Sequence, residues 1–172
     1  MFLVTSKEKH NCPACGKELT GHGTKKRHTK DENGGKVWYQ VPRKECKECG
    51  KTHCMLPDFM IPYKHYRAEI IEAVIDDTDI SFAIEESTIY RWKRWFRNIK
   101  EQLNSNLRAV RQAEEGLFYT LLGNTSSLLE EIRQSGGKWL AKAIGITINA
   151  GYPAYTQFAY SPSFICGRLD TS

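Results

Sequence analysis

The chain has 172 residues, 40% of them hydrophobic, which is enough for one ordinary domain or two small ones with a modest core. It holds no run of about eighteen apolar residues that could cross a membrane, and residues 1–6 lead straight into charged residues, unlike a secretory leader. The net charge is only +5, but residues 91–111 hold seven bases and one acid, whereas residues 68–86 hold seven acids and no base. Such a polarised chain indicates a basic face turned towards phosphate, in a protein that we expect in the cytoplasm.

Two copies of one short motif are the strongest signal near the N-terminus. They are Cys-Pro-Ala-Cys-Gly at residues 12–16 and Cys-Lys-Glu-Cys-Gly at residues 46–50. Each places two thiols on one tight turn, where the glycine can adopt the positive φ that the turn needs. Two such turns facing each other supply four sulfur atoms in a tetrahedron, the arrangement that a structural Zn²⁺ prefers. We therefore predict a structural zinc ion bound by Cys12, Cys15, Cys46 and Cys49.

Other roles for these cysteines compete with zinc binding. A disulfide pair is disfavoured, because scattered thiols without a secretory leader indicate a reducing compartment. A redox pair is disfavoured, because the motif occurs twice and no βαβ pattern surrounds it. A rubredoxin-type iron site uses the same four sulfur atoms and stays open as an alternative. His53 and Cys54 are spare ligand types beside the second motif, but the two matched pairs already complete the set.

Residues 25–41 predict a β-hairpin that joins the two motifs. The turn signal lies at residues 31–35, and the strand formers of residues 37–41 end at Pro42. The basic run at residues 25–28 is more often a solvated loop than a phosphate contact. Residues 58–66 form an aromatic connector, for which packing is favoured and base stacking is the sharper alternative.

From Arg67 the hydrophobic period becomes helical. A first amphipathic helix is expected through residue 76, a short second helix at residues 79–85, and a third from Thr88 to about Leu103. The third helix carries an apolar stripe, with basic and polar side chains on the opposite face. This arrangement is typical of a helix-turn-helix, whose last helix enters the major groove. The predicted DNA-binding residues are Ser87, Thr88, Tyr90, Arg91, Arg94, Arg97 and Asn98.

The C-terminal part predicts more helix and an irregular tail. One helix is expected from about residue 107 to residue 122, another at residues 128–134 and a third at residues 139–149, followed by an irregular tail at residues 152–172. Leu117, Leu121 and Leu122 suit either the intramolecular core, which is favoured, or the seam of a homodimer.

These elements add up to a mainly α fold with a small β zinc ribbon. We expect a zinc ribbon at residues 1–57, a connector at 58–66, a helix-turn-helix at 67–104, a helical region at 105–151 and the tail at 152–172.

The chain resembles an uncharacterised bacterial family linked to insertion sequences and transposons. The matching segments are Cys-Pro-x-Cys-Gly at 12–16, Arg-x-x-Cys-x-x-Cys-Gly at 43–50, Leu-Pro-Asp-Phe-Met-Ile-Pro-Tyr-Lys at 56–64, Ser-Thr-Ile-Tyr-Arg-Trp at 87–92, and the region 139–160. The resemblance implies a zinc ribbon plus helix-turn-helix, like the N-terminal DNA-binding part of some transposases. The chain departs from a full transposase in lacking room for a nuclease domain.

The leading hypothesis is a non-enzymatic protein that binds double-stranded DNA, is associated with a mobile element and is stabilised by zinc. The alternative is a zinc-ribbon adaptor that binds other proteins. A small metalloenzyme is the weakest hypothesis, because a complete set of four cysteines leaves no open position for water.

Overall fold

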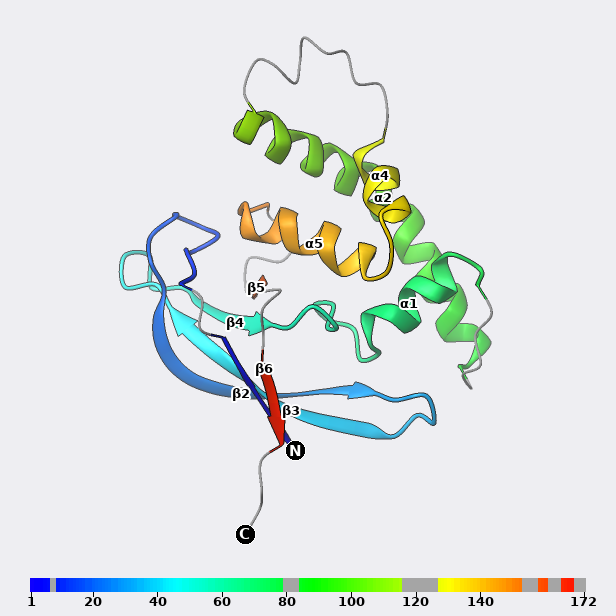
Figure 1. Cartoon of the computed structure of the whole chain (residues 1–172), viewed down its shortest axis with the longest axis horizontal. Helices are drawn as coiled ribbons and strands as arrows, with labels where there is room; N and C mark the ends of the chain where they lie inside the picture. Colours follow the sequence, from blue (N-terminus) through cyan, green and yellow to red (C-terminus); the bar gives the residue numbers. More distant parts are fainter. Residues whose placement is uncertain (7–8, 79–83, 116–126, 153–157, 161–164, 169–172) are drawn as a thin grey trace.

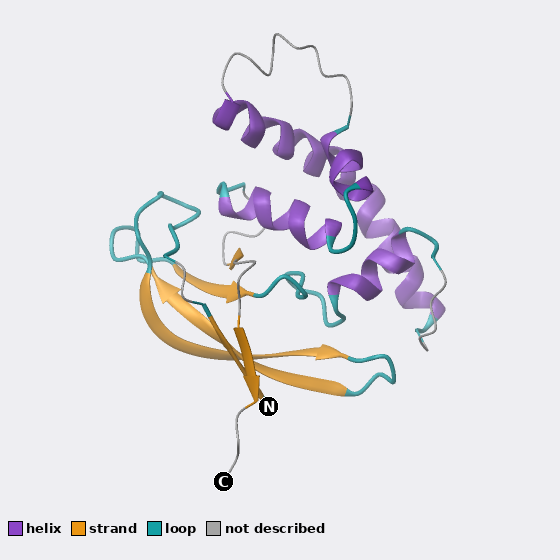
Figure 2. Cartoon of the chain, in the orientation of Figure 1, coloured by secondary structure: helices purple, strands orange, loops and turns teal. Residues whose placement is uncertain are grey.

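The protein consists of a twisted β-sheet with a layer of helices on one of its faces (Figure 1). The computed structural model describes all residues except 7–8, 79–83, 116–126, 153–157, 161–164 and 169–172. Figure 2 shows the two layers by colour, with the strands below and the helices above. Both halves of the sequence contribute to the sheet, because its last two strands come from the C-terminal tail.

The described part of the sheet has six strands of mixed direction. They run in the order β5-β4-β3-β1-β6, and β2 pairs with β3 outside this path. β1 is parallel to β3 and β4 is parallel to β5, whereas the other pairings are antiparallel. The strands are β1 (Phe2–Thr5), β2 (Thr20–Lys30), β3 (Lys36–Glu45), β4 (Thr52–Leu56), β5 (Phe158–Tyr160) and β6 (Ile165–Arg168).

The hairpin of β2 and β3 is the longest feature of the sheet and confirms the hairpin predicted at residues 25–41. Its register pairs Thr20 with Glu45 at one end and Lys30 with Lys36 at the other. The turn is held by the carboxylate of Asp31, which accepts hydrogen bonds from the backbone N–H groups of Asn33 (3.0 Å) and Gly35 (2.7 Å). Asp and Gly are the residues that such a turn favours, so the local sequence explains where the chain reverses.

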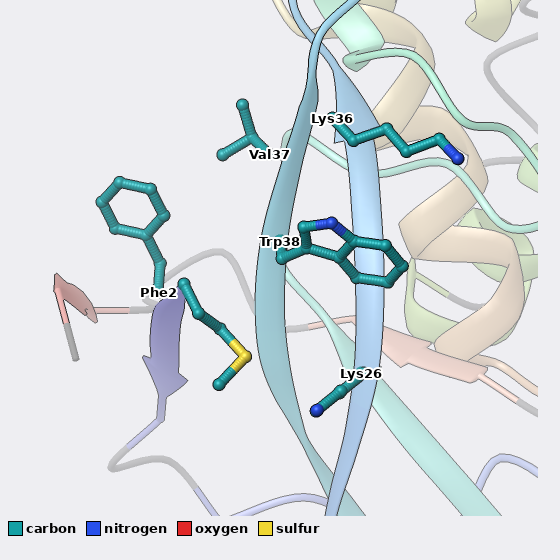
Figure 3. Close-up of a pocket in the computed structure, with 6 residues that line it drawn as sticks. Phe2, Lys26, Lys36, Val37 and Trp38 are labelled. Carbon is teal, nitrogen blue, oxygen red and sulfur yellow. The ribbon is translucent and has the colours of Figure 1, made fainter. Parts of the chain in front are cut away.

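Alternation along β3 gives the sheet one covered face and one open face. Tyr39 and Val41 are buried in the main core, whereas Trp38, between Val37 and Tyr39, is 42% exposed. Successive side chains of a strand point to opposite faces, so Trp38 lies on the face away from the helices. Figure 3 shows its indole on this hairpin, between the side chains of Lys36 and Lys26.

Four described helices cover the other face. They are α1 (Ala68–Ile75), α2 (Glu86–Glu115), α4 (Leu128–Gln134) and α5 (Trp139–Asn149). The helices predicted through residue 76, at residues 128–134 and at residues 139–149 are confirmed. α2 is amphipathic: Trp92, Phe96 and Leu103 are buried, while its remaining faces carry basic and polar residues. Aromatic contacts hold α2 in place, since Trp92 meets Tyr66 of the connector edge-on and Phe96 meets Trp139 of α5 edge-on.

A buried carboxylate fixes the start of α5 against α1. Glu72 is 5% exposed, and its two oxygen atoms accept hydrogen bonds from the backbone N–H groups of Lys138 (2.8 Å) and Leu140 (2.9 Å). These N–H groups lie in the first turn of α5, where no helical carbonyl can accept from them. Burial raises the pKa of Glu72 to about 7, although these hydrogen bonds act in the opposite direction.

The predicted fold class is wrong in two respects. The protein is not mainly α with a small N-terminal ribbon, because the sheet includes two strands from the tail that was expected to be irregular. It also has no helix-turn-helix over the described residues of 67–104: residues 84–85 are not helical, and residues 79–83 lie outside the description. The helix expected at residues 88–103 instead runs on to Glu115 as one element, because residues 104–115 contain no helix breaker and keep the apolar stripe through Leu107 and Val110.

Two smaller expectations concern the rest of the chain. The leucines proposed as a dimer seam, Leu117, Leu121 and Leu122, lie outside the described residues, so the seam stays a prediction, as do the five segment boundaries. Within the part of the chain that is described, no helix is long and apolar enough to span a membrane.

Candidate functional site

The two cysteine motifs form matching turns. In the first, the N–H of Gly16 donates to the carbonyl of Cys12 (2.8 Å); in the second, the N–H of Gly50 donates to the carbonyl of Cys46 (2.9 Å). Both glycines have positive φ, 73° at Gly16 and 66° at Gly50. A side chain with a Cβ is strained in this region, which explains why each motif ends in glycine.

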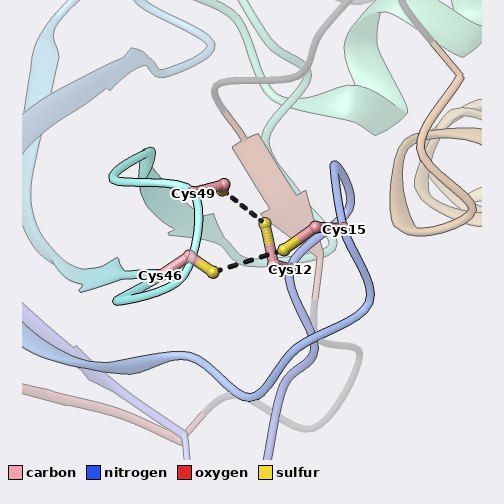
Figure 4. A group of neighbouring side chains, drawn as sticks. All are labelled: Cys12, Cys15, Cys46 and Cys49. Carbon is pink, nitrogen blue, oxygen red and sulfur yellow. Dashed lines mark hydrogen bonds between the residues drawn. The ribbon is translucent and has the colours of Figure 1, made fainter.

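These turns bring together the four predicted ligands (Figure 4). All four sulfur atoms lie within 4.8 Å of one another, with 3.6 Å between Cys12 and Cys49 and 3.4 Å between Cys15 and Cys46. Sulfur atoms about 2.3 Å from a tetrahedral Zn²⁺ would be about 3.8 Å apart, so the cluster is close to the required geometry. The four cysteines are therefore close enough together to bind a metal ion.

The surroundings of the cluster are apolar on one side and open to solvent on the other. Cys12 and Cys46 are buried with Leu19 and Met55, whereas Cys15 and Cys49 are exposed. The backbone hydrogen bond from Cys49 is the largest effect that lowers the pKa of Cys46, to about 7. Thiolates this close repel one another unless a cation lies between them, and a bound metal deprotonates its thiol ligands.

A histidine from β4 contacts the cluster from inside the protein. His53 is fully buried, and its Nε2 lies 3.4 Å from Sγ of Cys12, within hydrogen-bonding distance. His53 was considered as a substitute ligand, but its ring nitrogen meets a cysteine sulfur and is not part of the four-sulfur cluster. Cys54 is also buried, and it lies outside the cluster. His53 thus supports a ligand, a role that spacing alone did not reveal.

A second concave region lies beside β2, which we call the basic groove. It has a volume of about 450 Å³ and is formed by β2 and the connector after β4. No described residue that lines it is acidic, and Lys25 and Lys26 form no ion pair within the described part of the chain. Its lining residues are Lys25, Lys26, Arg27, His28, Leu56, Met60, Ile61, Pro62, Tyr63, Lys64 and His65.

The connector is fixed against both β2 and α2. The backbone N–H of Lys30 donates to the carbonyl of His65 (2.5 Å), and the imidazoles of His28 and His65 stack with centroids 4.7 Å apart. Lys64 lies over the ring of Trp95 on α2, 4.1 Å from its centroid. Burial lowers the pKa of Lys64, and the nearby charge of Arg91 lowers it further. The groove therefore holds a high density of positive charge.

Most of the predicted DNA-binding residues of α2 share one face of the helix, and their role stays a prediction. Arg91 lies near Lys64, but its guanidinium donates to the hydroxyl of Thr88 (2.8 Å), and Thr88 is buried. Tyr90 and Arg97 line a different hollow, with Lys93 and Arg133. Ser87, Arg94 and Asn98 are exposed on the outer side of the helix. Because the helix turns by about 100° per residue, six of these seven residues lie within one arc of about 120°, and only the buried Thr88 lies off it.

Sequence reasoning undervalued the groove. The basic run at residues 25–28 and the aromatic connector at residues 58–66 were both noted, but each was assigned a structural role. The two segments meet because β2 pairs with the connector, as the bridge between Lys30 and Tyr66 shows. No local pattern encodes this contact, because its partners lie 36 residues apart.

One family model matches part of the chain. It covers residues 12–92, from the first cysteine of the cluster to the first turns of α2, and is described as a domain of unknown function (DUF6431). No curated protein and no solved structure matches the chain. Residues 12–92 are thus similar to an uncharacterised family, whose match includes all four clustered cysteines and the whole basic groove.

Proposed function

We propose that the protein binds double-stranded DNA through the basic groove and that a structural Zn²⁺ holds the two cysteine turns. The observation that carries the proposal is the groove itself, which is lined by three lysines, an arginine and two histidines and by no described acid. Cations that meet a phosphate backbone displace its counterions, and this release supplies most of the affinity of non-specific DNA binding.

Zinc is the metal that suits the cluster best. Four thiolates are a complete tetrahedral shell for Zn²⁺, and such closed sites are structural. Two of the four sulfur atoms belong to buried residues, and the segments around them bury only a small apolar cluster. Metal binding would supply folding free energy that this burial does not. A closed shell also leaves no position for a reacting water, which supports a non-enzymatic role.

The proposed DNA contact uses β2 and the connector, with Arg91 at its margin. The exposed residues at the start of β2 and the connector's Tyr63, which is 61% exposed, leave the groove accessible from outside. A β-ribbon can enter a groove of DNA in place of a helix. Backbone contacts of this kind fix position and register without reading sequence.

Salt titration of DNA binding tests the proposal. Fluorescence anisotropy with a labelled mixed-sequence duplex would be recorded between about 50 and 200 mM salt. Each phosphate contact contributes about −0.9 to the slope of log K against log salt, so we expect Lys25→Ala and Lys64→Ala each to reduce the slope by about one. Lys142→Ala, an exposed lysine on α5, is the matched control and should leave the slope unchanged.

Two results would count against this function. A wild-type slope near zero would favour the protein-adaptor alternative, because an adaptor makes no phosphate contacts. A steep slope that none of the groove variants alters would place the DNA elsewhere on the molecule. Circular dichroism of every variant separates lost contacts from lost folding.

We extend the proposal to a mobile genetic element, on the basis of the sequence resemblance described above. The test is a gel shift with the terminal sequences of a neighbouring element against shuffled sequences of the same length. Preference for the terminal sequences would support the link, and equal affinity for both would remove it.

A further inference from the structure

The open face of the hairpin holds a second hollow beside the basic groove, which we call the Trp38 pocket. It has a volume of about 530 Å³ and is lined by Met1, Phe2, Lys26, Lys36, Val37 and Trp38. Lys26 lines both this pocket and the basic groove, so the two are adjacent. Figure 3 shows the indole of Trp38 on the hairpin, with Lys36 and Lys26 on either side of it and Phe2 across from it.

Trp38 is unusual among the four tryptophans in its exposure. Trp92 and Trp139 are 6% and 3% exposed, whereas Trp38 is 42% exposed. An exposed indole costs hydration free energy, which a planar ligand stacked on it would recover. Neither Lys26 nor Lys36 forms an ion pair with a described residue, so both ammonium groups are available to an anion.

An aromatic row connects this pocket to the groove. His28 contacts Trp38, with centroids 4.8 Å apart, and stacks on His65 on its other side, at 4.7 Å and an angle of 8°. Burial lowers the pKa of His28, and the positive charges of His65, Lys36 and Lys30 lower it further. The row therefore runs from the groove to an exposed indole, and lysines lie along it.

We propose that the Trp38 pocket takes an unpaired base of a DNA strand whose duplex lies in the basic groove. The base stacks on the indole, and Lys26 and Lys36 bind the phosphates on either side of it. Aromatic stacking platforms edged by cations are the general means by which proteins bind single strands without reading their sequence. The inference rests on the proposed function, because it uses the groove to place the duplex.

The test compares a blunt duplex with the same duplex carrying a short single-stranded thymidine overhang. Stacking of one base on an aromatic side chain contributes at least about a fivefold gain in affinity. We expect the overhang to bind wild-type protein at least about fivefold more tightly and to quench tryptophan fluorescence. Trp38→Ala should abolish this gain while leaving blunt-duplex affinity within about twofold, and Trp38→Phe should retain part of it.

The outcomes separate the two proposals. An overhang that gives no gain with wild-type protein, or a gain that survives Trp38→Ala, overturns the base site. A blunt duplex that fails to bind while the overhang still binds through Trp38 overturns the duplex groove and leaves the base site standing. Trp95→Phe, which alters the ring under Lys64, is the matched fluorescence control and should preserve the quenching.

Discussion

The two ends of the β2–β3 hairpin show how differently one element can serve structure and recognition. At the end near Thr20 and Glu45, the cysteine turns meet and four sulfur atoms lie within 4.8 Å of one another. Towards the turn at residues 31–35, the same strands carry lysines, a histidine and an exposed tryptophan that line two hollows. The first end gathers four sulfur atoms at one point, whereas at the second end Lys25, Lys26 and Lys36 have no acidic partner among the described residues.

This contrast predicts how each end of the hairpin responds to substitutions. A ligand set is all-or-none, because removing one sulfur leaves the metal with an incomplete shell and the other thiolates without compensation. A set of phosphate contacts is graded, because each cation contributes a similar and independent amount. Substitutions at the two ends should therefore differ in size and in kind.

The largest expected effect is that of Cys46→Ser. The loss of a buried ligand should abolish one-to-one zinc binding and unfold the two cysteine turns, since structural zinc contributes on the order of 10 kcal/mol to such small sites. Native mass spectrometry and circular dichroism would record both changes. Cys54→Ser is the matched control, because Cys54 is buried nearby but lies outside the cluster. Strong visible colour in the wild-type protein would indicate iron in place of zinc.

A smaller effect at the same end is expected from His53→Phe, which removes the contact between Nε2 and Sγ of Cys12. Groups that hydrogen-bond a ligand typically account for 10- to 100-fold in metal affinity, so zinc should still bind but about that much more weakly. Competition with a coloured chelator measures the affinity. His22→Phe serves as control, because His22 is exposed and lies beside Glu45. Equal affinities in both variants would mean that His53 only fills space.

At the basic groove, each substitution should weaken DNA binding by a similar step. Substitutions on α2 provide the comparison. Arg94 and Arg97 are exposed on α2, but Arg97 lines a hollow separate from the basic groove. The double substitution Arg94→Ala with Arg97→Ala should change the salt slope of DNA binding by much less than one, whereas Lys25→Ala with Lys64→Ala should reduce it by about two. A larger change in the salt slope for the α2 double variant than for the groove double variant would place the DNA contact on α2.

The last expected effect lies in neither end of the hairpin but in the helical layer that supports the sheet. The pKa of Glu72 is raised by burial to about 7, so the folded state holds its proton more tightly than the unfolded state does. The contribution of Glu72 to stability should therefore be greatest at low pH and fall as the pH rises towards 7, by at most about 3 kcal/mol at about 1.36 kcal/mol per pKa unit. Denaturant titrations at several pH values measure this fall.

Glu72→Gln is the control for that pH dependence. It removes the carboxyl group. The difference in unfolding free energy between wild type and variant at each pH therefore reports the effect of this group alone, without that of other groups such as histidines. The variant loses one acceptor for the N–H groups of α5 and should be less stable overall. A parallel pH dependence in both proteins would show that another group is responsible.

The cysteine cluster could be predicted because each of its two motifs is encoded by residues that are neighbours in the sequence. The cysteine spacing and the two glycines each specify a turn within five residues, and only the meeting of the turns required the fold. The hairpin was equally readable from the turn signal and the strand formers, and the amphipathic helices followed from their period. These features depend on neighbours in the sequence.

The remaining features depend on contacts between distant segments. The pairing of β1 with β6 joins residues near both ends of the chain. The sequence of the tail has no strong strand pattern from which this pairing could be predicted. The helix-turn-helix prediction failed because a basic outer face on a helix is equally compatible with a long amphipathic helix that packs on a sheet. The groove was missed because β2 and the connector become neighbours only in the folded protein.

The most direct test of the central claim is the DNA affinity of one preparation with zinc bound, after removal of zinc by a chelator, and after zinc is restored. The account predicts strong, salt-dependent DNA binding with zinc bound, loss of this binding and of structure in the cysteine turns when zinc is removed, and recovery of both when zinc returns. Undiminished DNA binding by the zinc-free protein would contradict the claim that the zinc site stabilises the hairpin in the conformation whose basic groove binds DNA.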